Sequence, residues 1–181
     1  MYTIDILKQE HDEISQFVDR LEEECIAIMN GKEVEIPFFE KSIYFIRTFA
    51  DDKHHKKEED ILFKYMIENL GAVAEKLIQH GMLVEHQMGR YHVMELEKNI
   101  QRYEETKADK EKIQIIGHSM GYVNLLRSHI DKENNAVYPF GEKQLPEELK
   151  KIIDDEMKDI YVQDEDKTKE KEELLKELLS Y

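Results

Sequence analysis

The sequence has little of what marks several large classes of protein. Its 181 residues include one cysteine, three prolines, seven glycines and no tryptophan. The single cysteine, Cys25, excludes an internal disulfide and favours a reducing compartment. Few glycines and prolines, beside abundant leucine, glutamate and lysine, are typical of a helical protein. The length predicts one domain with a substantial core.

Basic residues and long apolar runs are also scarce. The chain carries 26 Lys and Arg against 41 Asp and Glu, a net charge of -15, which argues against a nucleic-acid partner because phosphate binding needs clustered cations. Apolar runs such as "ILF" are far too short to span a bilayer. The N-terminal "MYTIDILKQEH" lacks the basic start and apolar stretch of a secretory signal. We therefore expect a cytoplasmic protein with no membrane partner.

Residues that interrupt helices divide the chain into four long segments. Gly31 and Pro37 interrupt "NGKEVEIP", Gly71 interrupts "ENLGA", and the polar "TKAD" and the "YPFGEKQLPEE" segment supply the other breaks. The helices expected between them span residues 3–30, 38–67, 72–105 and 109–140. Short connections between long helices predict an all-α fold, an up-down-up-down antiparallel four-helix bundle.

The last segment, residues 143–181, is expected to be a charged helical C-terminal extension of the bundle domain, residues 1–142. Its "EKEELLKELLSY" contains leucine pairs that can pack on the bundle or on another copy of the chain. A homo-oligomer joined through this extension is therefore one alternative. A solvated, partly frayed helix is the other.

Each predicted helix has an apolar stripe at alternating steps of three and four residues, and each stripe contains a histidine. The polar residues on these stripes are His11, His54, His86 and His129, with Glu58 and Glu133 one turn after two of them. One histidine on an apolar stripe is more often a satisfied core residue than a ligand. Buried carboxylates are costly unless they are paired or bound to a cation. The whole set therefore favours a shared cation over a metal-free helical interaction protein.

These six residues are also expected at similar heights along the axis of the bundle. With a rise of about 1.5 Å per residue, His11 lies roughly 12 Å from the start of its helix, and His54 about 20 Å before the end of its own. In an antiparallel bundle these ends coincide, so the residues can meet in one layer. His118 shares the stripe of His129 but lies about 16 Å from it. We interpret His118 as a helix-end histidine, with the lining of an access path as the alternative.

An internal repeat supports the same residues. "HHKKEEDILF" from His54 and "HIDKENNAVY" from His129 share His, then Lys at +3, Glu at +4, an aliphatic residue at +8 and an aromatic residue at +9. This doubled H-x-x-x-E, together with "LKQEHDEI" and "GMLVEHQMGRY" in the same order, resembles the hemerythrin-like (HHE cation-binding) family over about residues 1 to 142.

The resemblance implies a non-haem di-iron centre inside the bundle. Its ligands would be His11, His54, Glu58, His86, His129 and Glu133. By analogy, the two glutamates would bridge the irons. His11 and His54 would bind one metal, and the other two histidines would bind the second. Imidazole and carboxylate ligands suit iron, with manganese or zinc as alternatives.

A second pair at the same spacing, His55 and Glu59, lies beside the first. The apolar stripe and the register of the repeat both select His54 and place His55 and Glu59 on a more polar flank. We interpret His55 as a neighbour of the ligands or a solvated residue, with a place at a metal as the alternative. Glu10 and Glu85 each precede a stripe histidine and point away from it, so they are expected at the surface or in contact with a ligand residue.

Several other residues are expected to serve the fold. Tyr65 and Tyr122 are interpreted as core residues, with a hydrogen bond towards a bound ligand as the alternative. His80 and His92 lie on other faces of their helix and are expected to be solvated. Cys25 is expected to pack in the core.

The resemblance implies a protein that binds dioxygen, nitric oxide or a related small ligand for sensing, storage or detoxification. The alternative is a di-iron enzyme that decomposes peroxide or handles iron in the repair of damaged metal centres. Oxygen-carrying hemerythrins have two third-helix histidines four residues apart, but here Met82 and Arg90 flank His86 at that spacing, and neither suits oxidised iron. Unless His55, Glu85 or a tyrosine completes the site, open metal positions favour sensing or detoxification over oxygen transport.

Overall fold

The computed structural model describes residues 1–163 and 165–181, and the regular secondary structure of these residues is helical. The prediction of an all-helical protein is confirmed. In chain order the described elements are α1 (Tyr2–Met29), α2 (Ile36–Phe45), η1 (Ile46–His55), η2 (Glu58–Leu62), α3 (Phe63–Leu77), η3 (Ile78–Met82), α4 (Leu83–Thr106), α5 (Asp109–Lys132), η4 (Glu133–Val137), α6 (Tyr138–Gln144), α7 (Glu147–Gln163) and α8 (Glu165–Leu179). The elements labelled η are π-helical, with hydrogen bonds between residues i and i+5.

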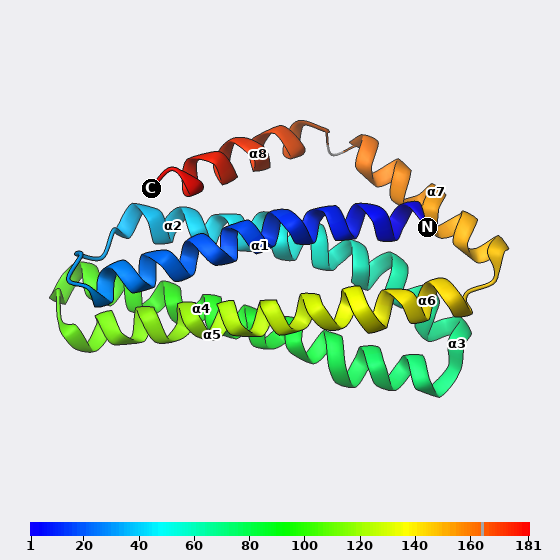
Figure 1. Cartoon of the computed structure of the whole chain (residues 1–181), viewed down its shortest axis with the longest axis horizontal. Helices are drawn as coiled ribbons and strands as arrows, with labels where there is room; N and C mark the ends of the chain where they lie inside the picture. The colour runs from blue at the N-terminus through cyan, green and yellow to red at the C-terminus, as the bar shows by residue number, and fades with distance from the viewer. Residues whose placement is uncertain (164) are drawn as a thin grey trace.

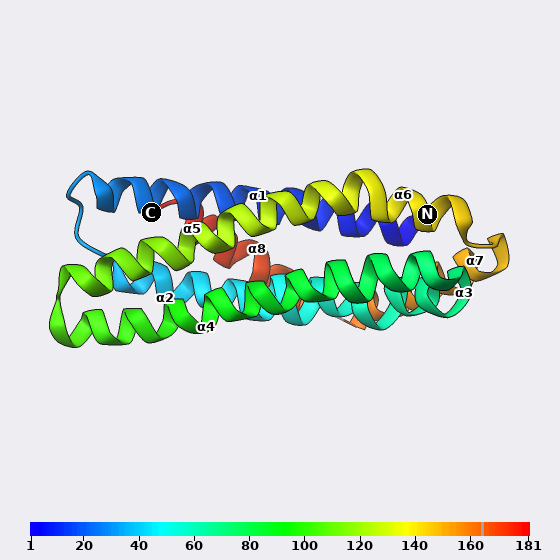
Figure 2. The same cartoon turned by 90° about the horizontal axis from the view of Figure 1, so that it is seen from below.

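The long elements run side by side along one long axis, and α7 and α8 lie along one side of them (Figures 1 and 2). Helix α4 packs on α5, α5 packs on α1, and α2 packs on α4. The path from α2 through η1 and η2 to α3 forms one continuous arm, and α5, η4 and α6 form another. This arrangement directs one side of each long element towards a shared interior.

The expected helix breaks occur where the sequence indicated them. Gly71 lies inside α3 with φ 69° and ψ -162°, a left-handed conformation that glycine adopts without a steric penalty. Lys107 ends α4 with φ 51°, and α5 begins two residues later. Predicted and observed helix ends differ by a few residues, as helix termini generally do.

The apolar core is divided into two clusters. Along α1, Leu7 belongs to one cluster and Ile14 to the other, with His11 between them. Phe63 packs in the cluster of Leu7, and Phe45 packs in the cluster of Ile14. A layer of buried polar side chains therefore crosses the bundle between two apolar regions, and this layer holds the candidate site.

The C-terminal extension packs on its own bundle, which is one of the alternatives left open by the sequence. Leu175 and Leu178 of α8 are buried in the same cluster as Ile14, and Ile153 and Met157 of α7 are buried in the other. Helix α8 contacts both α1 and α2. These four apolar residues of the extension are thus covered by the chain itself.

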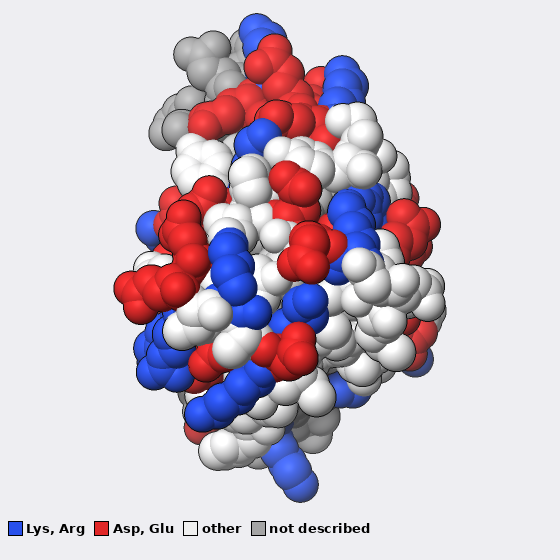
Figure 3. Space-filling model, turned by 90° about the vertical axis from the view of Figure 1, so that its left-hand side faces the viewer, with Lys and Arg blue, Asp and Glu red and all other residues white. Residues whose placement is uncertain are grey.

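The surface carries charges of both signs. The end of the molecule with the α1–α2 and α4–α5 connections presents acidic and basic side chains among uncharged ones (Figure 3), so the negative net charge is not gathered into one patch on this face. Among the described residues, none of the helices combines the length and the apolar character needed to cross a membrane.

The first turn of α1 is capped by a side chain of α7. Asp154 accepts hydrogen bonds from the backbone N–H groups of Tyr2 and Thr3 at 3.1 and 2.9 Å, and from the Thr3 hydroxyl at 2.8 Å. The N-cap residue of α1, Met1, provides no side-chain cap. Asp154 therefore satisfies amide groups that a helix start leaves without partners.

We expect Asp154→Ala to lower the free energy of unfolding by about 1–2 kcal/mol, because the capped amides lose their acceptor. Equilibrium urea unfolding measures this. The control is Asp155→Ala, which removes an exposed carboxylate paired with Lys158 at i,i+3 and should cost less than about 0.5 kcal/mol. Equal losses in the two variants would contradict the capping role.

Candidate metal centre

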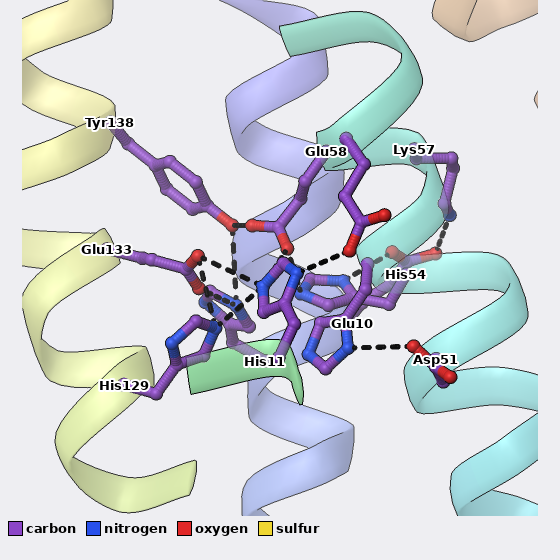
Figure 4. Close-up of polar contacts among 12 residues, drawn as sticks. Glu10, His11, Asp51, His54, Lys57, Glu58, His129, Glu133 and Tyr138 are labelled. Carbon is purple, nitrogen blue, oxygen red and sulfur yellow. Dashed lines mark hydrogen bonds and ion pairs between the residues drawn. The ribbon is translucent and has the colours of Figure 1, made fainter. Parts of the chain in front are cut away.

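The polar layer brings together the six residues singled out by the sequence and adds His55. These side chains come from six helical elements: His11 from α1, His54 and His55 from the end of η1, Glu58 from the start of η2, His86 from α4, His129 from α5 and Glu133 from the start of η4. None is more than 4% exposed. Several long elements therefore converge on one buried polar site (Figure 4).

The side chains form two groups that share Glu58. One group is His11, His54, Glu58 and Glu133, and the other is His55, Glu58, His86 and His129. Within each group, one possible ligand atom from every residue lies within 4.8 Å of the others. Distances of this size leave room for one ion at the middle of each group.

Each glutamate lies between histidines of both groups. Glu133 places Oε2 at 3.2 Å from Nε2 of His11 and Oε1 at 3.2 Å from Nε2 of His129. Glu58 places Oε2 at 3.8 Å from Nε2 of His54 and at 3.5 Å from Nε2 of His86. Both carboxylates therefore contact histidines of both groups.

The outer nitrogen of every site histidine contacts an oxygen. The Nδ1 contacts are His11 to Asn134 (3.0 Å), His54 to Glu10 (3.0 Å), His55 to Asp51 (3.3 Å), His86 to Glu59 (2.7 Å) and His129 to Glu85 (2.9 Å). A carboxylate or amide oxygen accepts, so it favours a proton on Nδ1 and leaves the Nε2 lone pair directed inwards. Histidines that bind metals are held in this way.

Several of the inward atoms then face one another without a hydrogen bond. Among the described residues, no hydrogen bond satisfies Nε2 of His54, Nε2 of His55, Oε2 of Glu58 or either carboxylate oxygen of Glu133. All are hydrogen-bond acceptors in the tautomers just described, and burial makes their mutual repulsion costly. A cation between them removes this cost, so the residues fit a metal site on their own chemistry.

The closeness of these buried groups also shifts the pKa values of the two carboxyls, Glu58 and Glu133. Burial, and then the negative charge of Glu133, raise the pKa of Glu58 well above its usual range. Burial also acts to raise the pKa of Glu133, but the contacts with His11 and His129 outweigh it and hold this pKa well below its usual range. Without a cation, two carboxylates this close do not both carry a full charge.

The pKa values of the site histidines are also shifted in opposite directions. Burial lowers the pKa of His54 to about 4 and that of His55 to about 3, so both are neutral imidazoles at neutral pH. Burial also acts to lower the pKa of His129, but Glu133 and Glu85 outweigh it and raise this pKa to about 9. A proton on His129 takes the place that a metal ion would have beside Glu133.

The interpretation of His55 as a residue on a polar flank is wrong. His55 is 4% exposed, and its ring stacks on that of His86 with centroids 3.8 Å apart and planes at 12°. The physical reason is η1, because each π-helical turn holds more residues than an α-helical turn and rotates the inward face. The consecutive residues His54 and His55 consequently both point into the interior.

Glu10 and Glu85 contact ligand candidates, which is one of the two roles expected for them. Each contact joins two different helical elements. Each glutamate precedes one site histidine in the sequence but contacts a different one on a neighbouring element. Asp51, Glu59 and Asn134 are partners that the sequence reasoning missed. The only signal for them was their nearness in sequence to a ligand candidate.

Tyr138 is a further residue that the sequence reasoning missed. Its hydroxyl donates a hydrogen bond to Oε1 of Glu58, and its ring stacks on His11 with centroids 5.5 Å apart. Burial, and then the charges of Glu58 and Glu133, raise its pKa well above the usual value. The aromatic position at +9 of the repeat, which holds Phe63 in one copy and Tyr138 in the other, was the available signal.

The remaining histidines lie outside the two groups. His80 is exposed, as expected. His92 is half-buried rather than solvated and places Nδ1 at 3.3 Å from Nδ1 of His118. Cys25 is buried, as expected, and burial raises the pKa of its thiol to about 11.

The residues four positions before and after His86, Met82 and Arg90, have structural roles. Met82 is buried in the apolar cluster of Leu7. Arg90 donates hydrogen bonds to Asp51 at 2.9 Å and to Glu59 at 3.0 Å. Since these two carboxylates contact His55 and His86, Arg90 fixes the partners of two histidines instead of supplying a ligand.

The model of the family described as the hemerythrin HHE cation binding domain matches residues 2–140. The chain belongs to this family. No curated protein and no solved structure matches the chain. Membership of the hemerythrin HHE family indicates a cation-binding domain, and the matched residues include all seven side chains of the two groups.

We expect His55→Ala to lower the metal content of the hemerythrin domain by about one ion per chain, because His55 is one of four residues around the second position. Elemental analysis after loading with ferrous iron under anaerobic conditions measures this. His80→Ala, which removes an exposed histidine, is the matched control and should keep the full content. Full content in His55→Ala would show that the second ion needs only the other three residues.

Proposed function

We propose that this hemerythrin HHE protein binds two iron ions in an up-down-up-down four-helix bundle. The ligands are His11, His54, His86 and His129 with Glu58 and Glu133 as bridges, as the sequence indicated, and His55 is added. The observation that carries the proposal is the set of buried nitrogen and oxygen atoms that face one another without hydrogen bonds. Imidazole with carboxylate favours iron, with manganese or zinc as substitutes.

The bound ions would supply redox chemistry and coordinate a small ligand such as dioxygen, nitric oxide or peroxide. The residues of the chain do the rest. Glu10, Glu59 and Glu85 hold imidazole Nδ1 protons and so keep each Nε2 directed inwards. The two apolar clusters exclude water from the layer, which strengthens electrostatic interactions within it.

Sensing, storage or detoxification of the small ligand is the role we propose. The sequence predicted open metal positions because the third helix lacks a second histidine. His55 fills one of these positions, because it supplies the second group with a third imidazole. Only the first group keeps two imidazoles beside its carboxylates, so its ion would have more open positions than the ion of the second group, which keeps fewer. The excess of acidic over basic residues and the shortness of the apolar runs support a cytoplasmic role without nucleic acid.

A di-iron enzyme that decomposes peroxide is the second candidate, and Tyr138 favours it. The hydroxyl of Tyr138 donates to a bridging candidate, Glu58, which places a hydrogen-bond donor next to the centre. Stopped-flow mixing of the reduced, iron-loaded protein with dioxygen and with peroxide separates the candidates. Dioxygen that is released unchanged supports reversible binding, whereas repeated peroxide consumption supports the enzyme.

Two iron ions per chain is the first expected result, measured by elemental analysis of protein purified from its native host. The expectation follows from two groups that share a glutamate. One ion per chain, or none after anaerobic iron loading, would rule out the dinuclear centre.

Removal of the metal should lower the melting temperature. An ion that binds only the folded chain at 100 times its Kd stabilises it by about 2.7 kcal/mol, which corresponds to roughly 5–10 °C for a domain of this size. Differential scanning calorimetry before and after chelation, with metal content checked in both samples, gives the shift. An unchanged midpoint would show that the centre does not contribute to folding.

A further inference from the structure

A cavity lies beside one of the two groups. Its volume is about 210 Å³, smaller than the pockets that bind drug-sized molecules but sufficient for several waters or one small ligand. Its lining comes from η1, α4 and α5 and includes Ile46, Asp51, His55, His86, Gly89 and Tyr122. Of the candidate ligands, only His55 and His86 line it, and both belong to the second group.

The hydroxyl of Tyr122 is the unexplained feature of this cavity. Tyr122 is 2% exposed, and its hydroxyl has no hydrogen-bond partner among the described residues. A buried hydroxyl without a partner costs free energy, so this position has a reason to carry tyrosine instead of phenylalanine. The buried hydroxyl of Tyr138, in contrast, is already used by Glu58.

The charges on the cavity wall are paired. Arg90 is held by Asp51 and Glu59, and Arg47, which also lines the cavity, is held by Glu97 at 2.7 and 2.8 Å. Both arginine side chains are partly exposed, at 33% and 48%, so the cavity extends from the two histidines to the surface. Because both cations are paired, size and hydrogen bonding select the ligand more than charge does.

Gly89 keeps the cavity open. A Cβ atom at this position would lie 3.7 Å from Cε2 of Tyr122 and 3.8 Å from Cδ2 of Leu125, which are ordinary contacts. An alanine therefore fits without displacing its neighbours, whereas a larger side chain extends into the space in front of Tyr122.

We infer that the small ligand enters through this cavity to the ion held by His55 and His86, and that the hydroxyl of Tyr122 donates a hydrogen bond to it. The inference rests on the proposed function. It names a binding place on one side of the centre and a donor that takes no part in holding metal. An uncharged diatomic molecule or a peroxide fits the volume, the paired charges and the single free donor.

Nitric oxide is the probe, and the protein is the full chain with its iron content verified and its iron reduced. Tyr122→Phe keeps the ring and removes the donor, so the affinity for nitric oxide should fall about three- to tenfold, the value of one neutral hydrogen bond. Iron content should stay at the wild-type value. The melting temperature of the metal-free variant should not fall, because the hydroxyl has no protein partner.

Tyr103→Phe is the matched control. Tyr103 is equally buried, and its hydroxyl donates to Glu33 at 2.9 Å, away from the cavity. This variant should lose stability and keep the affinity for nitric oxide, which is the reverse of the result expected for Tyr122→Phe. An unchanged affinity in Tyr122→Phe overturns the assignment of its hydroxyl.

Gly89→Leu tests the cavity itself, with Gly89→Ala as its control. The leucine should slow the association of nitric oxide, and the alanine should leave the rate near that of the wild type. An unchanged rate in Gly89→Leu overturns the assignment of the cavity. Failure of the proposed function shows earlier and differently, because the wild-type protein would then hold no iron or bind no nitric oxide.

Discussion

Two carboxylates buried between apolar clusters constrain the rest of this molecule. Glu58 and Glu133 are fully buried, so their surroundings must supply compensating groups, and these come in layers. Histidines surround the carboxylates, acidic or amide oxygens hold the histidines, and cations hold several of those oxygens in turn. The outer cations are Lys57 on Glu10, Arg90 on Asp51 and Glu59, and Lys132 on Glu85. Alternation of charge from the centre outwards lets a polar layer cross an otherwise apolar bundle.

The internal repeat gives this layer an approximate symmetry that the side chains break. Phe63 and Tyr138 occupy the same place in the two copies, but only the tyrosine has a hydroxyl, and it donates to the glutamate of the other copy. Glu58 therefore has a hydrogen-bond donor on one oxygen, while Glu133 depends on histidines alone. The cavity lined by His55, His86 and Tyr122 adds to the difference between the two sides.

Helix breaks and periodicity predicted the helical fold, and the structure brings together the six residues that periodicity, the repeat and the resemblance singled out, because those features depend on which face of a helix is apolar. Periodicity placed His55 outside because it assumed α-helical geometry through η1, where the turns are wider. Contacts such as Glu85 with His129 depend on how two helices are rotated against each other, and a pattern along one helix does not contain that information. The role of Tyr138 was hidden for the same reason.

The adjacent residues His54 and His55 belong to different groups, and Glu58, one turn later, belongs to both. One short stretch of backbone therefore positions side chains for two ions. An ion bound in the first group would order this stretch and so reduce the entropy that the second group must lose when its own ion binds. Loading would then be cooperative, and a population of half-loaded molecules would be small at equilibrium.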